Sequence, residues 1–207
     1  MKKSLFLLPL LAGLALCGCK DDNPGGKDDD GGDEGDYTAL DLTLDFDTIS
    51  AAIEESGGSG TGYAAVGAVE EIDGQAIAFE NVCINMLSEE SVPAWSTGGE
   101  EVNVIQFKNP TKGAGVISFT DVTAKKVTIN LLTSYSVSGD FKVTYGGKKQ
   151  KMKAGAGEET GYESIGSEEN YPISLYALTF DLSGEGGDLE ITNQGQGARY
   201  VQSIVIE

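Results

Sequence analysis

Apolar and polar residues alternate with a period of two along most of the chain after residue 36. In the segment 126–132, for example, the alternation puts Val127, Ile129 and Leu131 on one face. A period of two is typical of β-strands that are buried on one side. The segments predicted as strands are 39–46, 63–72, 76–86, 102–108, 115–121, 126–132, 141–145, 175–182, 188–192 and 199–207.

Turn sequences rich in glycine, such as Asp73-Gly74 and Gly146-Gly147, separate these segments. No long stretch has a helical period, although 48–56 could form one or two helical turns. About nine or ten short strands with glycine-rich turns predict an all-β sandwich or barrel. The alternation favours a two-sheet antiparallel β-sandwich in which each sheet buries one face.

Residues 1–18 have the composition of a secretory signal peptide: a basic start and then an apolar run of about a dozen residues. This run is shorter than the roughly 20 residues that a membrane-spanning helix needs. The sequence Leu16-Cys17-Gly18-Cys19 resembles the lipobox of bacterial lipoproteins. The resemblance implies cleavage after Gly18 and acylation of Cys19 with diacylglycerol and a further acyl chain such as palmitate, which together give stable anchoring. A plain secretory signal with two chance cysteines is the alternative.

The residues after Cys19 are strongly acidic. Lys20-Asp21-Asp22 resembles the export tag of surface lipoproteins in one Gram-negative group, which implies a lipid-anchored protein exposed on the outer membrane. Residues 19–36 contain eight acidic residues, two lysines and many glycines, and this composition predicts a flexible tether. Residues 37–207 then form the β-sandwich domain.

Charge and composition exclude several classes of function. Without residues 1–18, the chain has 12 basic and 33 acidic residues, a net charge of −21. Such a surface repels phosphate backbones, so we expect no nucleic-acid partner, and we expect the acyl chains alone to bind the membrane. The chain has no histidine, which excludes Ser-His-Asp and Cys-His catalysis and removes the commonest metal ligand.

We expect Cys83 to be a buried apolar residue rather than a reactive thiol, because it lies in an apolar segment without a neighbouring base. Adjacent acid pairs such as Glu100-Glu101 point to opposite faces of an extended chain and indicate no acid–base pair. The sequence therefore predicts a protein that is not an enzyme.

The C-terminal two thirds of the chain resemble a known family of binding modules. The resemblance rests on a loop with the single tryptophan, then the segments QFKN, GAGVISF, LTFDLSG and LEITN, and the closing strand ARYVQSIVIE. This order is similar to the jelly-roll, galactose-binding-like β-sandwiches that occur as carbohydrate-binding modules in surface lipoproteins. The resemblance implies a jelly-roll topology and glycan binding.

Candidate ligand-binding residues lie in two long polar segments. Trp95 could stack on the apolar face of a sugar or, alternatively, cap one end of the core. Tyr162, Asn170 and Tyr171 would also suit a glycan, and the alternative is a flexible loop with one fixed tyrosine. The site could include a structural calcium ion, for which the sequence names no ligands.

The lysines between 148 and 153 form the only basic cluster. They favour a protected sheet edge over a site for an acidic polysaccharide. The sequence as a whole predicts a surface-tethered glycan-binding lipoprotein that helps to capture polysaccharide. A protein-binding adhesion or assembly module is the alternative, and a polysaccharide lyase or hydrolase is a weaker one.

We expect Cys19→Ala to abolish lipidation, because the thiol of Cys19 is the atom that would be acylated. The variant would stay unprocessed, and mass spectrometry of the membrane fraction would detect no mature, acylated form. Cys17→Ala is the matched control and would be processed normally. Acylation that persists in Cys19→Ala would contradict this assignment.

Overall fold

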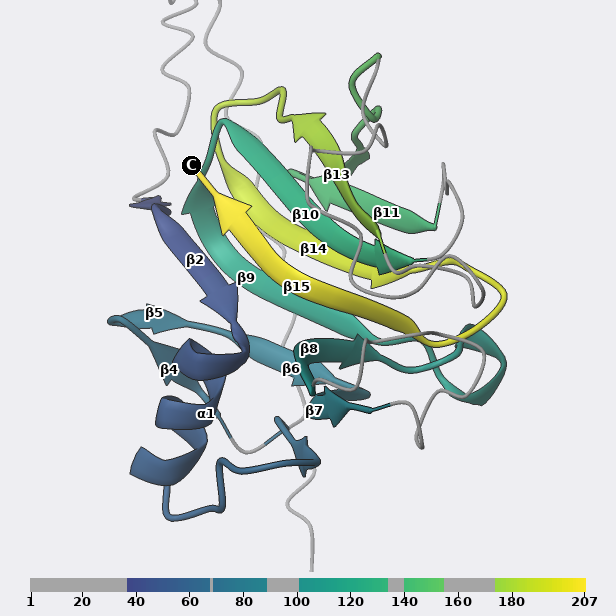
Figure 1. Ribbon diagram of the computed structural model, residues 1–207. Helices are drawn as coiled ribbons and strands as arrows, with labels where there is room; N and C mark the ends of the chain where they lie inside the picture. Colours follow the sequence, from purple (N-terminus) through teal and green to yellow (C-terminus); the bar gives the residue numbers. More distant parts are fainter. Residues whose placement is uncertain (1–36, 68, 89–100, 134–139, 155–173) are drawn as a thin grey trace, which may run out of the picture. The chain divides into compact units, whose positions relative to one another are not determined.

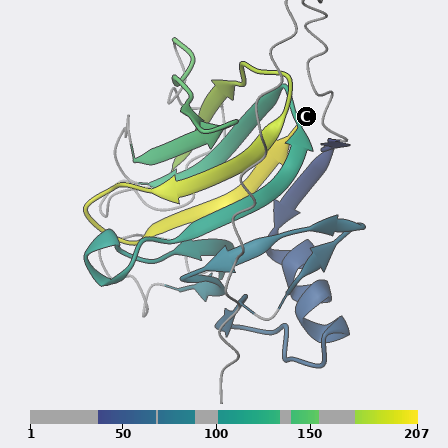
Figure 2. The same cartoon turned by 180° about the vertical axis from the view of Figure 1, so that it is seen from behind.

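The computed structural model describes residues 37–67, 69–88, 101–133, 140–154 and 174–207, and they form an all-β fold with one short α-helix. Two sheets, mainly antiparallel, contain most of the strands (Figures 1 and 2). The strands are β1 (Thr38–Ala39), β2 (Leu42–Asp45), β3 (Ala64–Ala65), β4 (Glu71–Ile72), β5 (Gln75–Ala76), β6 (Ala78–Glu80), β7 (Val82–Leu87), β8 (Val102–Phe107), β9 (Val116–Thr123), β10 (Lys126–Thr133), β11 (Phe141–Tyr145), β12 (Lys148–Lys149), β13 (Ser174–Asp181), β14 (Gly187–Asn193) and β15 (Arg199–Ile206).

Sheet A has the strand order β1-β9-β14-β11-β12, and β6 also pairs with β9. Sheet B has the order β13-β10-β15-β8-β7-β3, and β2 also pairs with β15. The pairing of β1 with β9 is parallel, and the other pairs are antiparallel. This arrangement is consistent with the β-sandwich that the alternating pattern predicts.

The two sheets share one apolar core. Residues that the period of two predicts to be inward, such as Ile129 of sheet B and Val143 of sheet A, are fully buried in the same cluster. Phe107 of sheet B meets Phe141 of sheet A edge to face, with ring centroids 5.1 Å apart. Since such aromatic pairs add about 0.5–1.5 kcal/mol beyond the area that they bury, this contact is a strong link between the sheets.

The chain changes from one sheet to the other at places that the sequence pattern does not mark. The alternation predicts one strand over 39–46, but β1 belongs to sheet A and β2 belongs to sheet B. The segment 76–86 divides in the same way into β6 and β7 at Asn81, which has a φ of 53°. Asparagine tolerates this left-handed conformation, and it turns the chain from sheet A toward sheet B.

The basic segment 148–153 closes one side of the fold. β12 is the edge strand of sheet A, and Met152 bridges to Phe180 in β13, the edge strand of sheet B. The buried side chain of Gln150 holds this segment, because its amide donates to the Lys148 carbonyl at 2.9 Å and accepts from the Ser183 hydroxyl at 3.0 Å. The lysines of β12 therefore lie on a sheet edge, as predicted.

A charged pair joins the sheets at one end. The guanidinium of Arg199 donates to both carboxylate oxygens of Asp140, at 2.7 and 2.9 Å. Arg199 begins β15 of sheet B, whereas Asp140 directly precedes β11 of sheet A. Such bidentate pairs of arginine and carboxylate are among the stronger polar contacts in proteins.

The only helix of more than one turn in the described ranges is α1 (Phe46–Glu55), which confirms the helical turns expected over 48–56. The carboxylate of Asp45 caps it by accepting from the Thr48 backbone N–H at 2.8 Å. Ile49 and Ile53 anchor the helix to the core. In Figure 1, α1 and the β4–β5 hairpin lie together below β2.

We expect Phe107→Ala to lower the free energy of unfolding by about 3–5 kcal/mol, because it removes a fully buried ring from the junction of the two sheets. Urea unfolding followed by circular dichroism measures this change. Phe79→Ala is the control, since Phe79 is only partly buried, and its loss should be clearly smaller. Equal losses in the two variants would contradict the importance of the Phe107–Phe141 contact.

Candidate functional site

The face of sheet B that points away from the core carries uncharged polar and aromatic side chains. Cys83 lies opposite Gln106, and Gln106 lies opposite Tyr200. These residues alternate along their strands with core residues such as Ile105, so they point away from the core. We call this surface the tyrosine–amide face, and it consists of Tyr63, Cys83, Asn85, Gln106, Thr128, Asn130, Thr179, Tyr200 and Ser203.

Charged side chains are scarce in the central rows of this face. Three successive rows of cross-strand neighbours contain Leu132, Tyr200, Gln106 and Cys83; then Ala177, Asn130 and Ser203, with Asp45 of β2 at the end of the row; then Thr179, Thr128 and Val205. The carboxylate of Asp45 is the cap of α1. The next row, at the ends of β10 and β13, contains Lys126 and Asp181. Because 23% of all residues in the chain are charged, this surface differs from the rest of the protein.

Tyr63 is the most exposed large hydrophobic side chain in the described part of the chain, with 63% of its surface accessible. It directly precedes β3, whose Ala65 pairs with Cys83, and its hydroxyl hydrogen-bonds to the Cys83 sulfur. This bond to Cys83 raises the pKa of Tyr63 above 10.0, the usual value for tyrosine.

Burial raises the pKa of Cys83 above 9.0, the usual value for a thiol. The hydrogen bond from Tyr63 and the charge of Lys108 act in the opposite direction and are smaller effects. Only 1% of the Cys83 surface is accessible, which confirms the prediction of a buried residue. Burial also raises the pKa of Tyr200 on the same face.

Two hydrogen bonds orient the amides of the face. Asn85 donates to the side-chain oxygen of Gln106 at 3.0 Å, and Asn130 donates to the hydroxyl of Ser203 at 2.8 Å. A primary amide has two N–H donors and two lone pairs, so each of these amides keeps further positions for a ligand or for water. All four residues are half-buried, which places their polar groups at the surface in defined orientations.

The sequence-predicted site residues Trp95, Tyr162, Asn170 and Tyr171, and the lipidation site Cys19, lie outside the described residues. Residues near the ends of those segments are described, however, and they meet. Leu87, Val102, Leu132 and Leu175 belong to one buried cluster with Val104, against which Tyr200 packs. Leu87 and Val102 flank the segment that contains Trp95, and Leu175 follows the segment that contains the two tyrosines.

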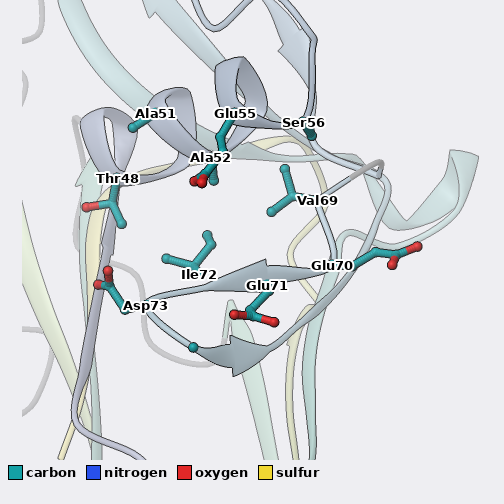
Figure 3. A pocket seen from close by; sticks show the side chains of 11 residues that line it. Thr48, Ala51, Ala52, Glu55, Ser56, Val69, Glu70, Glu71, Ile72 and Asp73 are labelled. Carbon is teal, nitrogen blue, oxygen red and sulfur yellow. The ribbon is translucent and has the colours of Figure 1, made fainter.

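A groove of about 830 Å³ lies between α1 and the β4–β5 hairpin (Figure 3). Val69 and Ile72 of its lining are buried, and carboxylates from the helix and the hairpin also belong to the lining. Figure 3 shows the side chains of Val69 and Ile72 pointing toward the helix. No group of three or more histidine, cysteine, aspartate or glutamate side chains that could hold a metal ion is found in the described part of the chain.

Sequence reasoning did not find the tyrosine–amide face or the groove. The face depends on strand register, which brings together residues between 63 and 203 that have no common motif. A signal was present in the alternation itself, because the outward positions of segments 102–108 and 126–132 include amides where other strands have charged residues.

Comparisons of the chain with protein-family models, with curated protein sequences and with solved structures gave no match. None of the helices in the described ranges has the length and apolar character of a membrane span.

The raised pKa of Cys83 has a consequence for stability at high pH. The folded state binds the thiol proton more tightly than the unfolded state does. The protonated thiol therefore adds to the free energy of unfolding, fully below about pH 9, and this contribution is lost as the pH rises through the folded-state pKa. We expect the free energy of unfolding, measured in urea, to fall as the pH rises above about 9. Cys83→Ala should reduce this fall, and an unchanged slope in the variant would contradict the assignment.

Proposed function

We propose that the protein is a lipid-anchored, non-catalytic glycan-binding protein of the bacterial cell surface. Cys19 would carry the anchor, residues 19–36 would form the tether, and the domain 37–207 would bind glycan through the tyrosine–amide face. We also propose for this domain the jelly-roll topology of the galactose-binding-like sandwiches. The all-β fold and its two sheets support this proposal, because binding modules of that family have the same general architecture.

The observation that carries the proposal is a surface of mainly uncharged polar side chains with an exposed tyrosine in a strongly acidic protein. A neutral sugar offers hydroxyl groups on its rim and C–H groups on its ring faces. The ring of Tyr63 can stack against such a face. The amides of Asn85, Gln106 and Asn130 can hydrogen-bond to hydroxyl groups, both as donors and as acceptors.

The scarcity of charged side chains on this face favours a neutral ligand. Burying a charged side chain under a sugar is costly unless the ligand supplies a partner. Half-buried amides that are already oriented by neighbours avoid this cost and lose little conformational entropy on binding. The tyrosine–amide face therefore suits a neutral glycan better than an acidic one.

The buried cluster of Leu87, Val102, Leu132 and Leu175 supports a contribution from the sequence-predicted residues. The segment that contains Trp95 begins and ends beside this cluster, at Leu87 and Val102, and the segment that contains Tyr171 ends beside it, at Leu175. We propose that Trp95, Tyr162, Asn170 and Tyr171 extend the same site. The proposal requires no metal ion. The glycan screen described below includes calcium in its buffer, so that binding that depends on a structural calcium ion would also be detected.

We expect Tyr63→Ala to weaken glycan binding about two- to tenfold, which corresponds to the loss of about 0.5–1.5 kcal/mol of stacking. A glycan array probed with the full chain would identify the ligand, and titration calorimetry would then measure the affinity. The melting temperature should stay unchanged, because Tyr63 is exposed.

Tyr37→Ala is the matched control, since Tyr37 is the other exposed tyrosine in the described ranges and does not belong to the face. Asn85→Leu is a second test, because it removes the amide at similar volume. No binding to any glycan, or equal losses in the Tyr63 and Tyr37 variants, would overturn the proposal.

A further inference from the structure

The groove between α1 and the β4–β5 hairpin is a second surface with the features of a binding site. Its volume of about 830 Å³ lies within the range of about 300–1,000 Å³ that is typical of ligand pockets. Val69 and Ile72 form an apolar floor, and only 5% and 4% of their surfaces are accessible. Ala51 and Ala52 of the helix continue this apolar lining on the opposite wall (Figure 3).

Four carboxylates belong to the residues that line the groove: Glu55 on the helix, Glu71 and Asp73 on the hairpin, and Glu70 directly before it. In Figure 3 the side chain of Glu55 points toward the floor, whereas those of Glu70 and Glu71 point outward from it. All four are exposed, and no lysine or arginine is among the described residues that line the groove. The three ion pairs found in the described ranges join other residues, namely Lys126–Glu207, Lys142–Glu190 and Arg199–Asp140. The rim is therefore unneutralised, and a cleft lined by one sign of charge concentrates the field of that charge.

The carboxylates do not form a metal site. Cation chelation requires several carboxylates that converge on one point, and no such group of three exists in the described part of the chain. In Figure 3, Glu55 lies on the helix side of the floor, and Asp73 and Glu71 lie at separate positions along the hairpin. A ligand that uses all of them must present several positive groups spaced along its length.

We propose that this groove binds a basic, partly apolar segment of a protein partner. Lysine and arginine have aliphatic stems that can cover Val69 and Ile72 while their charged ends reach the rim carboxylates. Charge complementarity of this kind also excludes anionic partners and speeds the encounter with cationic ones. This site is separate from the tyrosine–amide face and does not depend on the glycan-binding proposal.

The groove is held in its open form by contacts on both walls. On the helix side, Asp45 caps α1, and the Ser50 hydroxyl hydrogen-bonds to the Gly60 carbonyl. On the hairpin side, Asp73 and Gly74 both have left-handed backbones, with φ of 52° and 76°, as tight two-residue hairpin turns require. Because both walls are fixed, a ligand loses little binding energy in ordering them.

A second copy of this chain is a poor occupant. Its one basic cluster, the segment 148–153, is complementary to the rim in charge. However, each copy has a net charge of −19 over the whole sequence, and like-charged copies repel one another. A partner with a net positive segment, in contrast, is attracted to the acidic rim without this repulsion between whole molecules.

The test compares two triple variants of equal net charge. The groove variant is Glu70→Gln, Glu71→Gln and Asp73→Asn; asparagine suits the left-handed backbone at position 73. The control variant is Asp121→Asn, Asp181→Asn and Glu185→Gln, which removes three exposed carboxylates that do not line the groove. The probes are two fluorescein-labelled synthetic heptapeptides, one of alternating lysine and leucine and one of alternating lysine and glutamine.

Fluorescence anisotropy measures the affinity of each peptide for the full chain at two salt concentrations. We expect the lysine–leucine peptide to bind more tightly than the lysine–glutamine peptide, because only the first covers the apolar floor. The groove variant should lose about tenfold in affinity, as three lost exposed charge pairs imply, and the control variant less than twofold. Chemical-shift changes at the amides of Ala51, Ala52 and Gly74 should locate the bound peptide.

Three results would overturn the proposal. Equal losses in the two variants would mean that the peptide responds to the total charge of the protein and not to the groove. Absence of binding to either peptide at low salt would show that the groove has no affinity for basic segments. Self-association in sedimentation velocity that is lost in a Lys149→Glu, Lys151→Glu variant would make a second copy the occupant.

Discussion

The burial of one apolar core between two sheets is the interaction on which the rest of the structure depends. The only cysteine in the described ranges is unpaired, so no disulfide links the described strands, and no metal cluster is found there. A chain with an excess of 19 negative charges also weakens its own compact state through repulsion. The opposing free energy comes from inward residues of both sheets, with Phe107 and Phe141 in contact between them.

The core also determines where ligands can bind. The inward positions of sheet B are filled by apolar residues of this core, and part of its outward side is also apolar, since Val104 and Leu132 are buried in a second cluster. Next to that cluster, outward positions hold tyrosine, amide and hydroxyl groups, as in Tyr200, Gln106 and Ser203. The groove next to α1 depends on the core in the same way, since Ile49 and Ile53 fix the helix that forms one wall.

Much of the fold could be predicted from the sequence, because side-chain alternation is a local signal. The segments 126–132, 141–145 and 188–192 form strands within one residue of the predicted bounds, and the expected turns at Asp73-Gly74 and Gly146-Gly147 have the left-handed backbones of hairpin turns. The changes between sheets at Leu40-Asp41 and Asn81 could not be predicted, because they depend on which distant strand offers a free edge. For the same reason, the sequence could not show that Tyr63, Asn85 and Gln106 share one face.

The way in which the chain enters the fold affects how the domain would carry mechanical load. β1 pairs in parallel with β9 of sheet A, and Leu40 adds a backbone hydrogen bond to Thr123 at 2.8 Å. β2 then pairs with β15 of sheet B. A pull on the chain before residue 37 therefore acts on hydrogen bonds of both sheets in succession. The tension reaches the tyrosine–amide face through β15, whose Tyr200 belongs to that face. Under the proposed function, the strand that would support the ligand is thus also part of the load path.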